Sequence, residues 1–141
     1  MATFNKINAF VENMAEKVHN LGADTLKIML TNVAPVATNT VLLDLTEIAA
    51  GNGYTAGGTA VTITSSAQSS GTYKLVGSDV VFTASGGTIG AFRYAVLYND
   101  TPTSPADPLI GWWDYGSAVT LNSGETFTVD LDPTNGILQL V

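Results

Sequence analysis

The alternation of apolar and polar side chains over residues 89–131 constrains the fold of this chain more than any other feature. Residues 125–131 alternate strictly, with phenylalanine, valine and leucine at one parity and threonine or aspartate between them. This period of two is that of a half-buried antiparallel strand. Residues 92–98 are largely apolar at both parities, which predicts a central strand or one covered on both faces. The same stretch holds both tryptophans, three of the five tyrosines and the only arginine.

Further short strands are expected at residues 25–31, 60–64, 72–76, 79–84, 118–121 and 137–141. Gly77-Ser78 lies where a hairpin turn would join two of them, and the serine-rich segment 65–71 and the glycine-rich segment 51–59 are expected as loops. About eight or nine strands without βα alternation predict an all-β fold. An antiparallel β-sandwich, most consistent with a jelly roll, is expected because two packed sheets leave fewer exposed strand edges.

The N-terminal segment shows a different period, with apolar residues three and four positions apart: Phe4, Ile7, Phe10 or Val11, Met14, Val18 and Leu21. This spacing predicts an amphipathic helix that ends at Gly22. Alternatively, residues 16–21 form a first strand and the first dozen residues an arm. We therefore expect a helix or arm over 1–22, packed on the domain or on a neighbour, and one sandwich domain over 23–141. Packing on its own domain is favoured over a tether between subunits.

Composition narrows the classes of partner. Hydrophobic residues make up 45% of the chain and charged residues only 12%, which suggests that neighbours cover part of the surface. The formal net charge of -7 argues against nucleic acid and anionic membranes as partners. The chain has no cysteine, which excludes disulfides and thiolate metal sites. It shows neither a secretory leader nor a membrane-length apolar run, so synthesis in a cytoplasm is expected.

No pattern in the sequence predicts catalysis. His19 is the only histidine and has no nucleophile motif nearby, so a solvated or cap-bonded side chain is expected. Residues 130–136 lack the spacing and the glutamate of a calcium loop, and 51–58 lack the ending of a phosphate loop. No carboxylate pair stands out among Asp100, Asp107, Asp114 and Asp130. We therefore predict no catalytic residue, no metal site and no cofactor, and the chain is not expected to be an enzyme.

The aromatic residues Trp112, Trp113 and Tyr115 are the strongest candidates for recognition. Adjacent residues of a strand point to opposite faces, so the two tryptophans are expected on opposite sides of the sheet. One is expected to fill the core while the other covers the sheet or a subunit interface, although an exposed ring would also stack on a sugar. Arg93 is expected to form an ion pair with Asp114 or Asp130 rather than to act in catalysis.

Two blocks of sequence carry a resemblance to a known family: KIMLTNVAPVATNTVLLDLTEIAAGNGYTAGG and AFRYAVLYNDTPTSPADPLIGWWDYGSAVTLNSGETFTVDL. They resemble small proteins of tailed bacteriophages that are encoded with the head genes. Such proteins are cement, or decoration, proteins: jelly-roll subunits that dimerise, bind outside an HK97-type shell and tie capsomers together. The resemblance implies a structural virion protein on the outer capsid surface. It implies the major capsid protein and a second copy as partners, as a homodimer or alternatively a trimer, and no catalytic pattern.

Three regions are expected to supply the contacts to the capsid and to other copies: residues 4–21, the loop 51–59 and one face of the strand around 112–115. The candidate interface residues are Phe4, Phe10, Tyr54, Arg93, Trp112, Trp113 and Tyr115. Many copies on one lattice would stabilise a shell through multivalency even if each contact is weak. A carbohydrate-binding or receptor-binding module on the virion is the alternative interpretation.

Overall fold

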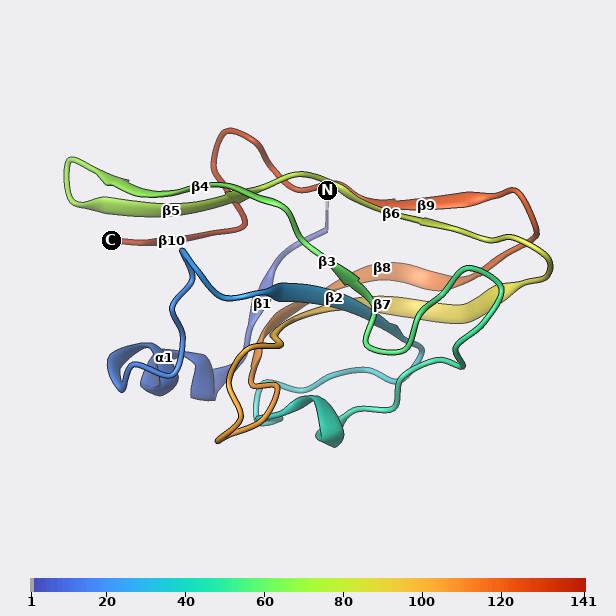
Figure 1. Cartoon of the computed structure of the whole chain (residues 1–141), viewed down its shortest axis with the longest axis horizontal. Helices are drawn as coiled ribbons and strands as arrows, with labels where there is room; N and C mark the ends of the chain where they lie inside the picture. The colour runs from blue at the N-terminus through green and yellow to red at the C-terminus, as the bar shows by residue number, and fades with distance from the viewer. Residues whose placement is uncertain (1) are drawn as a thin grey trace.

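The computed structural model describes residues 2–141 as two layers of antiparallel strands with one short α-helix (Figure 1). The lower layer in Figure 1 is a five-stranded sheet of order β1-β8-β7-β2-β3. Its strands are β1 (Asn5–Lys6), β2 (Leu26–Thr31), β3 (Thr59–Ala60), β7 (Ile89–Asn99) and β8 (Leu109–Leu121). The prediction of an antiparallel all-β sandwich with a short N-terminal helix is confirmed. The finer prediction, a jelly roll, is not established by this strand order.

The upper layer consists of two smaller sheets, one of order β10-β5-β4 and one that pairs β6 with β9. Their strands are β4 (Ile63–Ser69), β5 (Thr72–Gly77), β6 (Val80–Thr83), β9 (Thr126–Val129) and β10 (Leu138–Leu140). The short stretch between β5 and β6 carries the chain from one of these sheets to the other. The alternation predicted around β9 is confirmed, because Val129 and Leu131 are buried while Thr126, Thr128 and Asp130 are exposed.

The centre of the lower sheet is covered on both faces, as its sequence predicts. β2 and β7 pair in register, with Met29 opposite Val96 and Ile28 opposite Leu97, and all four side chains are fully buried. The upper layer covers one face, and α1 (Asn8–Ala15) and residues 32–48 lie below the other (Figure 1). Burying an aliphatic side chain of this size contributes about 1.5–3 kcal/mol to stability, so these strands hold the fold together.

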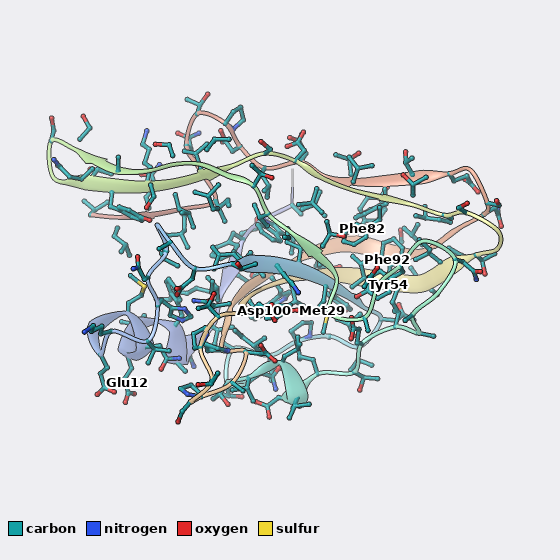
Figure 2. The ribbon with its side chains drawn as sticks, in the orientation of Figure 1. Glu12, Met29, Tyr54, Phe82, Phe92 and Asp100 are labelled. Atoms are coloured by element: carbon teal, nitrogen blue, oxygen red, sulfur yellow. The ribbon has the colours of Figure 1, made fainter. Side chains whose placement is uncertain are left out.

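An aromatic group fills one end of the space between the layers, where Tyr54, Phe82 and Phe92 lie close together (Figure 2). The rings of Tyr54 and Phe82 have centroids 5.9 Å apart. Phe92 meets Phe127 of β9 edge to face at 4.9 Å. Such tilted pairs are the favoured aromatic geometry and join residues from both layers into one core.

The N-terminal helix is shorter than the apolar spacing predicts, and residues 16–21 do not form the alternative strand. Residues before the helix are extended because β1 pairs with β8, which places Asn5 opposite Trp112. After the helix, Lys17 has a φ of 67°, in the left-handed region, where an α-helix cannot continue. Only Phe10 of the helix is buried, so the helix is held chiefly through that side chain.

Three predictions about the strands are wrong. The serine-rich segment is not a loop, because β4 continues to Ser69 and turns into β5 at Ser70-Gly71. Gly77-Ser78 is not a hairpin turn, because the chain continues from β5 toward β6 there. The N–H of Ser78 donates to the carbonyl of Thr62, and the carboxylate of Asp79 accepts from the N–H of Leu131 at 2.8 Å. Residues 118–121 are not a separate strand but the end of β8.

Candidate functional site

An apolar cleft of about 190 Å³ lies where β8 of the lower layer faces β9 of the upper layer. Trp113 and Tyr115 contribute aromatic rings from β8, and Phe127 contributes a third from β9. Arg93 and Asp130 supply charged groups to its lining. Three of the candidate interface residues, Arg93, Trp113 and Tyr115, therefore lie together in one site.

The position of Trp113 follows from the small residues around it. Trp113 lies opposite Ala95 of β7, whose methyl side chain leaves room for the indole. Phe4 packs against the same indole with ring centroids 5.1 Å apart. The ring of Phe4 passes over Gly111, where an added Cβ would lie 2.3 Å from it. Any larger residue at position 111 would displace Phe4 from Trp113.

A bulge in β8 brings Tyr115 to the mouth of the cleft. Tyr94 pairs with Asp114 and Phe92 with Val119, so four residues of β8 lie opposite the single residue Arg93. A bulge of this kind bends a strand and changes the direction of its side chains. Tyr115 is 58% exposed and meets Phe127 edge to face at 5.3 Å.

The charges in the cleft are partly neutralised. Arg93 donates two hydrogen bonds to Asp114, from Nε to Oδ1 at 2.8 Å and from Nη2 to Oδ2 at 3.0 Å. These bonds hold the pKa of the Asp114 carboxyl below its usual range and raise the pKa of Arg93. One of the two ion pairs predicted for Arg93 is confirmed. Both side chains remain more than a third exposed, so the pair orients groups more than it stabilises the fold.

Trp112 lies on the other face of β8, as strand geometry predicts for adjacent residues. It pairs with Val96, and its carbonyl accepts a hydrogen bond from the side chain of Asn5 at 3.3 Å. The expectation that one tryptophan is fully in the core is wrong, because both indoles are only partly buried.

Phe10 and Tyr54, also candidate interface residues, are each only 3% exposed. Phe10 packs against the imidazole of His19. The hydroxyl of Tyr54 donates to the Glu47 carboxylate at 2.6 Å and accepts from the N–H of Leu30 at 3.1 Å. Burial, followed by the bond to Glu47, raises the pKa of this phenol above its usual value. These two side chains have almost no surface to offer a partner.

Within residues 2–141, no three histidine, aspartate or glutamate side chains are grouped as a metal site would require. The helix α1 is too short to cross a membrane, and no other described helix is long and apolar enough.

No family model, curated protein or solved structure matches the chain. The resemblance to phage decoration proteins therefore depends on the two sequence blocks alone.

A second surface, which the sequence analysis did not single out, lies on the segment that covers the lower sheet. This segment exposes three large aliphatic side chains, Val33, Val36 and Leu43, of which Leu43 is 92% exposed. The sequence carries a weak signal for it, since Leu42-Leu43 places two leucines side by side and a short turn of helix can bury only one. The 3-10 helix Leu42–Asp44 directs Leu42 inward and leaves Leu43 in solvent.

Proposed function

We propose that this chain is a structural virion protein that binds the outside of an HK97-type phage shell. Its partners would be the major capsid protein and further copies of itself, and its role would be to link neighbouring shell subunits. The sequence resemblance supplies this function. The observation that supports it is the almost fully exposed Leu43, together with Val33 and Val36, in a chain with few charged residues. Covering these exposed aliphatic side chains with a partner would remove apolar surface from water, which favours association.

Hydrogen bonds order the segment that carries Leu43. The Asp44 carboxylate accepts hydrogen bonds from the N–H of Thr40 at 2.7 Å and the N–H of Val41 at 3.2 Å. These bonds keep the pKa of Asp44 below its usual value. The N–H of Leu42 donates to the carbonyl of Asp107 at 3.0 Å, which ties the segment to the domain. A preordered surface loses little conformational entropy on binding, which favours attachment.

Attachment would stabilise the shell through the number of copies. Each copy that bridges two shell subunits makes the release of either subunit depend on breaking the contact to the other. A modest affinity per contact is then sufficient to stabilise the shell.

The test is co-sedimentation of the purified chain with mature shells from which the natural copies have been stripped. We expect saturable binding at a fixed ratio to shell subunits and a higher disruption temperature for decorated shells. Leu43→Ser should weaken binding roughly tenfold or more, because the contact would lose one buried leucine. Val81→Ser is the matched control, since Val81 is 51% exposed but lies on β6 in the other layer.

Two results would contradict the proposal. Absence of saturable binding to shells of the correct maturation state would remove the cement function. Binding that Leu43→Ser leaves unchanged would remove the aliphatic segment as the contact surface.

A second function, saccharide binding, is favoured by the cleft. Aromatic faces such as those of Trp113 and Tyr115 stack on the apolar face of a sugar ring. The remaining N–H groups of Arg93 and the carboxylate of Asp130 are suited to sugar hydroxyls. Because Asp114 already neutralises Arg93, the cleft favours a neutral sugar over an anionic one.

The saccharide function is tested by the fluorescence of Trp112→Phe protein, in which Trp113 is the only indole left, titrated with a panel of neutral mono- and oligosaccharides. We expect a saturable change that Tyr115→Ala abolishes and Leu43→Ser leaves intact. A flat titration with every sugar to beyond about 1 mM would exclude a useful saccharide site.

A further inference from the structure

His19, the only histidine, is buried in the turn segment that joins α1 to β2. Its side chain is 6% exposed, and its ring lies 5.2 Å from the ring of Phe10. Beside it lies Asn99, the last residue of β7, which is fully buried. Neither side chain belongs to the cleft or to the aliphatic segment.

The hydrogen bonds of Asn99 determine which nitrogen of His19 carries the proton. The Asn99 Oδ1 accepts the N–H of Thr101 at 3.1 Å, which fixes the orientation of the amide. Its Nδ2 therefore faces Asp24, donating to Oδ2 at 2.7 Å, and His19, at 3.0 Å from Nδ1. An amide nitrogen can only donate, so Nδ1 of His19 must accept. The ring is neutral and its proton is on Nε2.

A protonated His19 does not fit this network. Its Nδ1–H would point at the amino group of Asn99, donor against donor. Rotation of the Asn99 amide would relieve that contact, but it would turn the oxygen toward the Asp24 carboxylate and the amino group toward the N–H of Thr101. The second nitrogen gives no compensation, because Nε2 is buried and has no hydrogen-bond partner within residues 2–141.

The surrounding charges are few. Asp24, on the same segment, is the carboxylate that favours the protonated ring, and burial opposes it more strongly. The pKa of His19 is therefore lowered from its usual value of 6.5. Lys17, just after the helix, and Tyr73 from β5 also line the groove beside His19, and neither is a carboxylate.

We propose that His19, Asn99 and Asp24 form an acid-sensitive latch, in which protonation of His19 breaks its bond to Asn99 and releases residues 8–25 from the end of β7. The native state binds this proton less readily than the unfolded state, so the latch is closed and fully stabilising above about pH 6.5. Its contribution falls as the pH decreases below that value. The latch operates in the isolated chain and does not depend on the proposed capsid function.

The first test uses the unmodified full chain. The ¹⁵N shifts of the imidazole, followed by NMR through a pH titration, should show the Nε2–H tautomer at neutral pH and a midpoint below 6.5. The amides of His19 to Asp24 and of Asn99 to Thr101 should shift with the same midpoint. After correction for intrinsic rates, amide exchange within residues 8–25 should accelerate severalfold on the acid side. An Nδ1–H tautomer, or a midpoint at or above 6.5, would overturn the proposal.

Two variants separate titration of the ring from other effects of acid. His19→Asn keeps an acceptor close to the position of Nδ1 but cannot be protonated, so exchange within residues 8–25 should become independent of pH between 5 and 7. Asp24→Asn removes the charge that favours the protonated ring while keeping an acceptor oxygen, so the transition should move to lower pH. Acid loosening that persists unchanged in His19→Asn, or a transition that moves upward in Asp24→Asn, would contradict the latch.

Discussion

Gly58 marks the closest approach of the loop after Gly51 to the central strand β2. Its φ is +82°, and an added Cβ would lie 1.9 Å from the carbonyl oxygen of Ile28. Backbone atoms cannot move aside as a side chain can. Gly58→Ala is therefore expected to lower the free energy of unfolding by roughly 2–5 kcal/mol, the sum of left-handed strain and overpacking. Urea denaturation of the full chain measures this loss.

Gly71→Ala is the matched control for this prediction. Gly71 has nearly the same φ, +83°, but no atom lies within 4 Å of an added Cβ. Backbone strain alone should lower the free energy of unfolding of Gly71→Ala by about 1–2 kcal/mol. If both variants lost the same free energy of unfolding, the steric contact with β2 would not contribute to the effect at Gly58.

Tyr54 gives a second prediction for a single residue, because its hydroxyl joins the loop to the sheet. Tyr54→Phe would leave the N–H of Leu30 and the carboxylate of Glu47 without this partner. We expect a loss of roughly 1–3 kcal/mol in the free energy of unfolding, measured by chemical denaturation. Tyr115→Phe should be nearly neutral, since that side chain is 58% exposed. A neutral Tyr54→Phe would mean that water replaces both bonds.

The sequence predicts some of these residue-level features and not others. The ion pair of Arg93 was predictable because a lone arginine on an apolar strand needs a carboxylate, and Asp114 lies on the neighbouring strand. The burial of Tyr54 was not predictable, since it lies in a glycine-rich loop with no apolar period. Its burial depends on contacts with Leu30 and Phe82, which are distant in sequence.

The hairpin of β4 and β5 turns through only Ser70 and Gly71, both with positive φ, at 51° and 83°. Two such residues form the turn type that matches strand twist, and asparagine suits the first position better than serine. Ser70→Asn is expected to raise the free energy of unfolding by about 0.5–1 kcal/mol, measured by thermal and urea unfolding. Ser65→Asn, within β4, should give no gain. A loss at position 70 would contradict the turn assignment.

This hairpin also shows where sequence patterns fail at the scale of elements. The side chains of β4 from Thr64 to Ser69 are all exposed, so the strand has no apolar alternation to reveal it. Its conformation comes from pairing with β5. By contrast, β2 and β7 were predictable because most of their side chains are apolar and buried, so the sequence of each strand alone shows the pattern.

At the scale of the whole molecule, the sandwich was predictable but its division into sheets was not. Alternation shows that a strand has a buried face and does not show which strand lies beside it. β5 and β6 are consecutive and nearly continuous, yet β5 pairs with β4 and β10 while β6 pairs with β9. The candidate cleft depends on this arrangement, because Tyr115 and Phe127 meet only when β9 lies over β8. Local periodicity therefore predicts which aromatic residues lie on strands, but it does not predict that Tyr115 and Phe127 are in contact.

The hairpin of the upper layer is much less buried than the centre of the lower sheet, which leads to a prediction about their relative stability. The hairpin end of β4 and β5 extends beyond the strands of the lower sheet (Figure 1). Met29 and Val96, at the centre of that sheet, are completely buried. Amides of residues 66–74 are therefore expected to exchange with solvent by local opening, at a lower free energy than the amides of Met29 and Val96.

Native-state hydrogen exchange, followed by NMR at increasing denaturant, distinguishes local from global opening. The hairpin amides should show a small dependence on denaturant, because local opening exposes little new surface. The amides of Met29 and Val96 should follow the global unfolding curve. If the hairpin amides followed the same curve, the two sheets of the upper layer would unfold only together with the lower sheet. The apolar contacts beneath β5, such as fully buried Leu75, would then be enough to make the whole sandwich one cooperative unit.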